Sequence, residues 1–306
     1  MINTVAALAC SVEPVVACAA LLGEGPVWDA AGQCLWWVDI KGPALFRREM
    51  GGRVDRWVPP MRIGAVAPAE GGGLLAATDR GFVSIAPEQA RYTPLAHPEA
   101  HLPGNRANDG KLDRRGRFWA GTMDDAEVSD SGSLYLLEAG SAPRRMDSGY
   151  RVLNGPAFSP AGYRLYVTDS ARRKIFALDL APDGSLSHKR IFAQFAADDG
   201  YPDGMTVDSE GCLWIAFWDG WCVRRMAPDG SRLAEIAMPV QRPTSCTFGG
   251  ADLSTLFITS ARIGLDAAAL AVQPHAGGLF ACVPGVVGLA DPPFGHSSQL
   301  TDRVPA

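Results

Sequence analysis

Four polar residues of this 306-residue chain stand at one repeated distance, eight positions, before a glycine. They are Glu24, Asn108, Asn154 and Asp203, which precede Gly32, Gly116, Gly162 and Gly211. Carboxylate and amide oxygens are hard ligands that suit Ca²⁺, Mg²⁺ or Mn²⁺ and tolerate Fe²⁺ or Zn²⁺. If the fold brings the four together, they could hold one divalent ion that is acidic enough to polarise a carbonyl group.

A plain turn is the alternative interpretation of each residue. A glycine follows each one closely, at Gly25, Gly110, Gly155 and Gly204. Asn-Gly and Asp-Gly are common turn dipeptides, so any one of them alone is explained by a turn. Glu24-Gly25-Pro26 is not a usual turn sequence, however, and the identical spacing in four places favours a shared site.

A second repeated position lies three residues before the same glycines. It holds Asp29, Asp113, Ser159 and Asp208. Asp113-Arg114-Arg115-Gly116 and Asp208-Ser209-Glu210-Gly211 have Asp first and Gly last, as type I turns prefer. These residues therefore predict turns between strands.

Short apolar strands rich in aromatic residues recur along the whole chain. Their centres are Trp36, Leu75, Trp119, Tyr166, Trp214 and Phe257, at intervals of 39, 44, 47, 48 and 43 residues. Six units of this length predict an all-β fold, a six-bladed β-propeller with four-stranded blades. If the repeated polar position starts the innermost strand of each blade, its side chains converge on the axis.

The ring of a propeller must close. An extra N-terminal strand around Val15–Ala19 could complete the last blade and cover its edge. We therefore expect one domain over residues 1–306 with a core of about 15–285, and one short helix at Leu265–Val272. The repeats do not resemble WD40 units, because Trp218-Asp219 is the only Trp-Asp pair.

Composition excludes several classes of protein. The net charge is −5 with scattered Lys and Arg, which argues against nucleic acid as a partner. No apolar run approaches the ~20 residues of a membrane span, and the apolar N-terminus has no Lys or Arg before Lys41, unlike a signal peptide. Seven cysteines without a C-x-x-C pair disfavour a disulfide framework and indicate a reducing cytoplasm. We expect a monomer.

The sequence lacks the motifs of serine hydrolases and of phosphate-binding loops. There is no G-x-S-x-G of a serine hydrolase and no G-x-x-x-x-G-K-[ST] or G-x-G-x-x-G phosphate loop. The five histidines show no spacing typical of metal ligands.

Five motifs carry a resemblance to a known family. They are Leu22-Gly23-Glu24-Gly25-Pro26, Asn105-Arg106-Ala107-Asn108-Asp109-Gly110, Gly121-Thr122-Met123, Asn154-Gly155-Pro156 and Tyr201-Pro202-Asp203-Gly204. From Leu22 to about Cys282 the chain resembles the senescence-marker-protein/regucalcin/gluconolactonase family of six-bladed propellers, and within it the bacterial xylono-, arabinono- and gluconolactonases of sugar oxidation.

The resemblance implies roles for individual residues. Glu24, Asn154 and Asp203 would bind one divalent metal, and Arg106 and Asn108 would contact the substrate, a sugar lactone. Arg106 and Asn108 are two positions apart, so on a strand they share a face. Some family members have a substrate-binding Glu a few residues after Gly-Thr-Met, where this chain reads Asp124-Asp125-Ala126.

The hypothesis is metal-assisted opening of an aldonolactone to the aldonic acid. Asp203 is the expected general base, although a ligated carboxylate is a poor base. Asp109 is assigned to the substrate site and is the alternative base. Two other functions stay open: a non-catalytic Ca²⁺-binding or regulatory protein, and a propeller hydrolase that acts on other esters.

Overall fold

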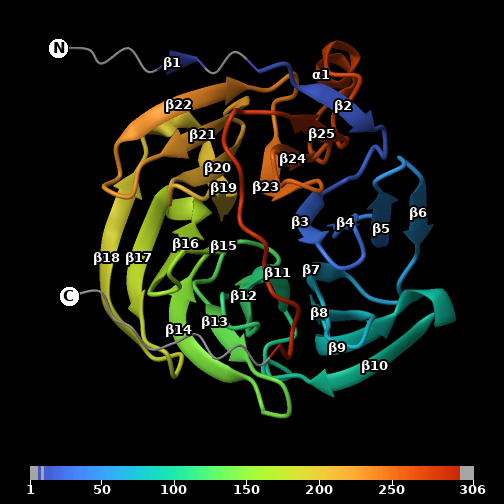
Figure 1. Cartoon of the computed structure of the whole chain (residues 1–306), viewed down its shortest axis with the longest axis vertical. Helices are drawn as coiled ribbons and strands as arrows, with labels where there is room; N and C mark the ends of the chain where they lie inside the picture. The colour runs from blue at the N-terminus through green and yellow to red at the C-terminus, as the bar shows by residue number, and fades with distance from the viewer. Residues whose placement is uncertain (1–5, 8–9, 297–306) are drawn as a thin grey trace.

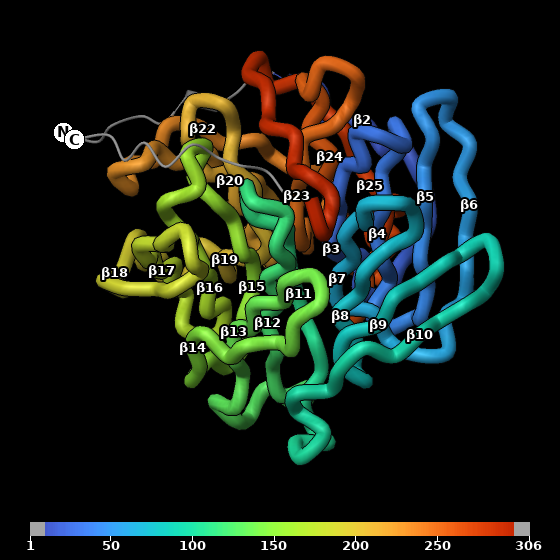
Figure 2. Tube along the Cα trace, turned by 60° about the horizontal axis from the view of Figure 1, so that its bottom comes forward, coloured from blue at the N-terminus to red at the C-terminus, as the bar shows by residue number. Residues whose placement is uncertain are grey.

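The six-bladed propeller predicted from the repeats is confirmed. The computed structural model describes residues 6–7 and 10–296. These residues form six sheets, antiparallel apart from one added parallel strand, that follow one another around a ring in chain order (Figures 1 and 2). In five blades the chain enters at the innermost strand and works outwards, and the sixth blade takes its outermost strand from the N-terminus.

The strands of each blade are ordered from the innermost, nearest the axis, to the outermost. The innermost strands are β3 (Gly23–Asp29), β7 (Ile63–Pro68), β11 (Asn105–Leu112), β15 (Leu153–Phe158), β19 (Tyr201–Val207) and β23 (Pro243–Gly249). The second strands are β4 (Cys34–Asp39), β8 (Leu74–Thr78), β12 (Phe118–Asp124), β16 (Arg164–Asp169), β20 (Leu213–Trp218) and β24 (Thr255–Ser260). All six strand centres expected from the sequence lie in these second strands.

The outer half of each blade is more exposed. The third strands are β5 (Ala44–Glu49), β9 (Gly81–Ala86), β13 (Gly132–Leu137), β17 (Lys174–Leu180), β21 (Cys222–Met226) and β25 (Leu279–Cys282). The outermost strands are β6 (Val54–Trp57), β10 (Arg91–Ala96), β14 (Arg144–Tyr150), β18 (Leu186–Gln194), β22 (Arg232–Ala237) and β2 (Glu13–Val16), and β1 (Ala6–Ala7) pairs in parallel with β22.

Helical structure is scarce. The described part of the chain has one short α-helix, α1 (Ala267–Val272), where the sequence predicted one, and 3-10 turns at Pro87–Gln89, Ser170–Arg172 and Ala197–Asp199. None of the helices in the described segments has the length and apolar character needed to cross a membrane. All seven cysteines are free thiols.

Aromatic side chains fill the spaces between neighbouring blades. Trp119 of blade 3 packs on Phe158 of blade 4 with ring centroids 6.0 Å apart, and Trp28 of blade 1 stacks on Phe257 of blade 6 at 6.3 Å. Side chains of this size bury much apolar surface, which holds blades together that share no hydrogen-bonded strand edge. The aromatic repeat in the sequence is therefore the repeat of these interfaces.

An N-terminal strand closes the ring, as predicted, but slightly earlier than Val15–Ala19. Strand β2 begins at Glu13 and pairs antiparallel with β25, with Glu13 opposite Ala281 and Val16 opposite Leu279. The last blade therefore combines both ends of the repeat region. This arrangement covers the edge of β25, which would otherwise be open.

Every innermost strand has a β-bulge or irregularity at the repeated polar position. The register shifts fall between Glu24 and Val27, Ile63 and Ala65, Ala107 and Gly110, Asn154 and Ala157, Pro202 and Met205, and Pro243 and Ser245. A bulge bends its strand and redirects side chains. Gly25 adopts φ +53°, and a Cβ on Gly204 would lie 2.2 Å from Ser245 Oγ, so these two positions require glycine.

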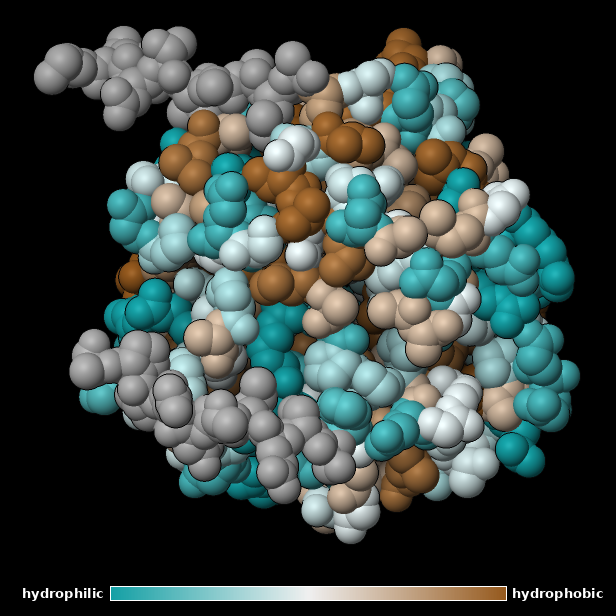
Figure 3. Space-filling model, in the orientation of Figure 1, coloured by the Kyte–Doolittle hydropathy of each residue, from teal (hydrophilic) through white to brown (hydrophobic). Residues whose placement is uncertain are grey.

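The segment 283–296, here called the strap, crosses the end of the ring where the innermost strands finish (Figure 1). It accepts a hydrogen bond from Ser209 N, donates one to Leu253 O, and pairs with the β7–β8 turn through Phe294 N and Pro68 O at 2.7 Å. Apolar and polar side chains are intermixed on this face (Figure 3). The strap thus ties three blades together at the end away from the repeated polar residues.

Candidate metal and substrate site

A cavity of about 650 Å³ opens at the end of the ring where the innermost strands start. Five of the six site residues expected from the sequence line it: Glu24, Arg106, Asn108, Asn154 and Asp203. They come from the first, third, fourth and fifth blades. The remaining two blades place Gly64 and Thr244 at the same position. A Cβ on Gly64 would lie 2.7 Å from the backbone of Ala107, so this blade contributes close packing instead of a ligand.

The two amides of the site form a directed pair. Asn108 Nδ2 donates to Asn154 Oδ1 at 2.7 Å and to Leu153 O at 2.9 Å. Asn154 Nδ2 donates to Ser170 Oγ at 2.9 Å. These contacts fix the orientation of the Asn154 amide, and its oxygen keeps a second lone pair for a ligand.

The two carboxylates of the site are buried. Glu24 and Asp203 are 4% and 5% exposed. Gly25 N donates to Glu24 Oε2 at 3.1 Å, whereas Asp203 Oδ1 has no hydrogen-bond partner among the described residues. Burial raises the pKa of both groups well above the usual range, and repulsion from Asp109 raises both further. Buried charge of this kind is costly unless a cation compensates it.

These residues fit an oxygen-ligated divalent cation. The donor set is two carboxylates and one amide oxygen, and the unpaired Asp203 Oδ1 is a free ligand atom. Across residues 10–296 no three His, Cys, Asp or Glu side chains form a cluster that could hold a metal. A metal site here therefore depends on the amide oxygen of Asn154 as its third ligand.

Arg106 lines the cavity although its side chain is only 4% exposed. Its Nη1 donates to Ala107 O at 3.0 Å and to Asn108 Oδ1 at 2.7 Å, and its Nε donates to Asp125. Arg106 and Asn108 do share a face, as the alternation of a strand predicted. The guanidinium thus lies at the cavity wall with its position fixed on two sides.

Asp109 is placed differently from the prediction that it binds substrate. It is not among the residues that line the cavity. Its Oδ1 accepts a hydrogen bond from Gly110 N at 2.7 Å, and its Oδ2 accepts one from Gly155 N at 3.0 Å. Burial raises the pKa of Asp109 to about 6, and Lys111 opposes that rise. As the neighbour of Asn108 it points to the other side of the strand, where it braces the backbone of two blades.

Several cavity residues were not predicted because they lie in connections between strands. Lys41, Glu127, Asp219 and Arg242 line the cavity beside Trp218 at the end of β20. Arg242 Nε donates to Asp219 Oδ1 at 2.6 Å, and its guanidinium lies 4.7 Å from the Trp218 ring. The sequence gives only weak signals for these residues: Asp219 stands in the Trp218-Asp219 pair, and Glu127 stands one residue beyond Asp124-Asp125-Ala126.

Comparison with known proteins agrees with the fold and the motifs. Residues 22–262 match the SMP-30/Gluconolactonase/LRE-like region. The chain is 36% identical to a 6-deoxy-6-sulfogluconolactonase of Pseudomonas putida over 90% of this chain and 95% of that protein. It is also 36% identical to an L-arabinolactonase of Azospirillum brasilense over 89% and 92% of the two chains.

A solved structure is similar throughout. The calcium-binding protein regucalcin of Agrobacterium tumefaciens matches with a TM-score of 0.88 and 30% identity over 93% of this chain and 97% of that one. The family match over residues 22–262 covers most of the blades and includes Glu24, Arg106, Asn108, Asn154 and Asp203. The chain belongs to the SMP-30/gluconolactonase/LRE-like family.

Proposed function

We propose that this protein is a metal-dependent sugar lactonase that opens an aldonolactone to the aldonic acid. The observation that carries the proposal is the unpaired, buried Asp203 Oδ1, which lies beside Glu24 and Asn154 in a cavity large enough for a sugar. Two relatives named for sugar lactones, each 36% identical over nine-tenths of this chain, support the substrate class.

Glu24, Asn154 and Asp203 would hold one divalent cation, with Ca²⁺, Zn²⁺, Mn²⁺, Mg²⁺ and Fe²⁺ as candidates. When bound, such an ion supplies electrophilic polarisation of the lactone carbonyl. The calcium-binding description of the Agrobacterium protein supports a divalent ion in this fold.

The protein residues would bind and orient the lactone. Arg106 is buried and permanently cationic, so it can donate charged hydrogen bonds to the oxygens of the lactone. Asn108 adjoins it at 2.7 Å and extends the polar wall towards Asn154. Trp218 presents an aromatic surface on the same cavity, against which the apolar face of a sugar can pack.

Asp203 is the proposed general base. A carboxylate has two oxygens, so one can face the cation while the other accepts a proton from the attacking water. Asp109 is the weaker candidate because both of its oxygens accept hydrogen bonds from the backbone.

A non-catalytic calcium-binding protein is the second candidate, since the similar Agrobacterium structure is described as regucalcin, a calcium-binding protein. The same three ligands would serve it. The two candidates differ in turnover: only the lactonase releases acid from a lactone. A hydrolase of other esters would differ from the lactonase in its substrate.

The test is pH-stat titration of glucono-, arabinono- and xylonolactone with chelated protein, before and after one divalent ion at a time is restored. Phenyl acetate and a phosphotriester serve as other esters. We expect metal-dependent acid release from at least one lactone and little from the other esters. Glu24→Gln should abolish it, whereas Asp29→Asn, at the opposite end of the same strand, should not. Metal binding without turnover of any lactone would reject the lactonase.

A further inference from the structure

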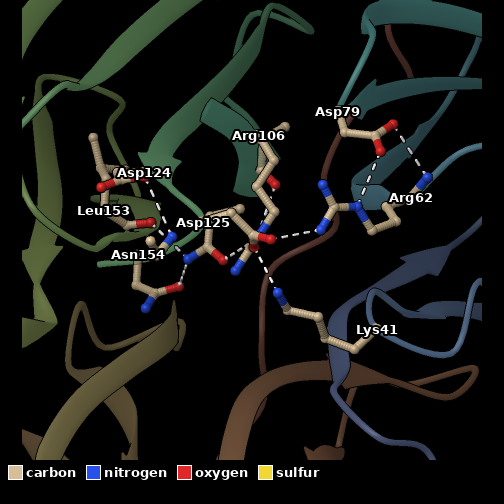
Figure 4. Close-up of polar contacts among 11 residues, drawn as sticks. Lys41, Arg62, Asp79, Arg106, Asp124, Asp125, Leu153 and Asn154 are labelled. Atoms are coloured by element: carbon tan, nitrogen blue, oxygen red, sulfur yellow. Dashed lines mark hydrogen bonds and ion pairs between the residues drawn. The ribbon is translucent and has the colours of Figure 1, made fainter. Parts of the chain in front are cut away.

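Asp125 joins three cations from three blades beside the cavity (Figure 4). Lys41 Nζ lies 2.6 Å from its Oδ1, Arg62 Nη1 lies 2.7 Å from its Oδ2, and Arg106 Nε donates to its Oδ1. Burial opposes ionisation, but these three donors outweigh it and hold the pKa of Asp125 well below its usual range. The carboxylate is therefore a fixed negative charge.

Asp125 is itself held in place. Arg62 is anchored by Asp79, whose Oδ2 accepts from Arg62 Nε at 3.0 Å and whose Oδ1 accepts from Arg62 N at 3.2 Å. Lys41 approaches from the first blade. The position of Asp125 is thus set by the first and second blades as well as by its own.

Arg106 depends on this carboxylate. Among the described residues Asp125 is the only acid that forms an ion pair with Arg106. Glu24 and Asp203 nevertheless line the same cavity as Arg106 and are buried to a similar extent, and the charge of Arg106 opposes the rise in the pKa of both. A buried guanidinium that lost Asp125 would be drawn to these two carboxylates, since an unpaired charge in the interior is strongly unfavourable.

We propose that Asp125 is a positioning residue that keeps the guanidinium of Arg106 away from Glu24 and Asp203, so that both remain free to bind the cation. The inference rests on the metal site of the proposed function. A guanidinium and a divalent ion would compete for the same oxygens, so the ion pair with Asp125 protects metal affinity without contact between Asp125 and the metal. It also holds Arg106 at the cavity wall for the substrate.

Competition between Arg106 and the divalent ion predicts a result that a purely structural role of Asp125 does not predict. Asp125→Ala should weaken metal binding by about 10- to 100-fold, the range found when groups supporting metal ligands are removed. Removing Arg106 as well should restore binding, because the competitor is then absent. A loss caused by general damage to the fold would persist or grow in the double variant.

The experiment is calorimetric titration of chelated full-length protein with Ca²⁺ and with Mn²⁺. We compare the wild type, Asp125→Ala, Asp125→Ala/Arg106→Met, and the matched control Asp79→Ala, which changes the same network but leaves Arg106 paired. The double variant and the control should bind within about threefold of the wild type. If melting curves show that Asp125→Ala does not fold, Asp125→Asn with and without Arg106→Met replaces it and should show the same order.

Two results would overturn the inference alone: unchanged affinity in the Asp125 variant, or a loss that the Arg106 substitution does not reverse. A wild-type protein that binds neither ion would overturn the metal site and this inference together. The failure of the proposed function is therefore distinguishable from the failure of the role of Asp125.

Discussion

The fifth blade carries an aspartate at each end of its innermost strand, and the two are treated in opposite ways. Asp203, near the start of β19, is buried with its Oδ1 unpaired. Asp208, just after the strand, is fully buried with both oxygens engaged. Its Oδ1 accepts from Glu210 N and Cys212 N, and its Oδ2 accepts from Trp214 Nε1 and Arg225.

The third blade repeats the satisfied arrangement. Asp113 Oδ1 accepts from Arg115 N at 2.8 Å and from Arg117 N at 3.1 Å. Its Oδ2 accepts from Arg117 Nε and Trp119 Nε1. An aspartate, an arginine and a tryptophan therefore close the turn in two blades, each with every partner supplied by the protein.

The contrast separates scaffold from site. Buried polar groups are normally hydrogen-bonded, so a fully satisfied aspartate is explained by the fold alone. An unsatisfied carboxylate with a raised pKa costs stability and persists where function requires it. By this criterion one end of the ring stabilises the blades, and the other end has the unsatisfied carboxylate that the proposed metal and substrate site requires.

Asp203→Asn should have the largest effect, on activity and metal binding but not on the stability of the metal-free protein. Losing a ligand and general base should lower kcat/KM for the lactone by about 10²- to 10⁴-fold. The melting temperature of the metal-free protein should stay the same or rise, because a buried charge is removed. Lactone kinetics and calorimetry of chelated protein measure both. A large drop in the melting temperature of the metal-free protein would show that Asp203 stabilises the fold, as Asp208 does, and would contradict the contrast.

Asp208→Asn should show the reverse pattern. It breaks the ion pair with Arg225 and the hydrogen-bonded turn, which should cost about 2–4 kcal/mol of unfolding free energy. Metal affinity and kcat per folded molecule should remain near the wild type. Denaturant unfolding and active-site titration check this. If activity falls with stability unchanged, the division between the two ends is wrong.

Arg106→Ala should separate substrate binding from metal binding at the end of the ring that holds the cavity. Arginine has no acceptor and cannot ligate a cation, so metal affinity should hardly change. Loss of a charged hydrogen bond to the lactone should lower kcat/KM by roughly 10- to 150-fold. Kinetics titrated with metal give both values. Rescue of turnover by excess metal would show that Arg106 does not contact substrate.

The pH dependence of the metal-free protein should show a smaller effect. The folded pKa of Asp109, about 6, exceeds its usual value, so its contribution to stability is complete below about pH 4 and is lost as pH rises to about 6. The loss should be on the order of 2 kcal/mol. Urea unfolding at several pH values should show this fall relative to Asp109→Asn. Parallel curves for the two proteins would contradict it.

The repeat explains which features of the fold and the site the sequence could predict. Blades are similar, so one position in each maps to one height in the ring, and residues as distant as Glu24 and Asp203 were correctly expected to meet. The number of blades and the closure by the N-terminus followed from the same repeat. Neither conclusion needed knowledge of side-chain contacts.

The remaining features depend on contacts that no repeat encodes. Lys41, Glu127 and Arg242 reach the cavity from connections between strands, whose paths are set by local geometry. Asp109 was expected to bind substrate, but the register shift in β11 and the backbone of Gly155 determine where its carboxylate goes. The Asp125 network unites three blades through long side chains, so only the folded chain shows it.

Anomalous diffraction from a crystal of this protein soaked in Mn²⁺ would test the central claim most directly. The proposal predicts one peak in the cavity, with oxygens of Glu24, Asn154 and Asp203 at roughly 2.0–2.4 Å, and none at Asp113 or Asp208. The absence of a peak from the cavity would contradict the metal site and the contrast between the two ends of the ring. So would a peak that is coordinated by other residues and not by these three.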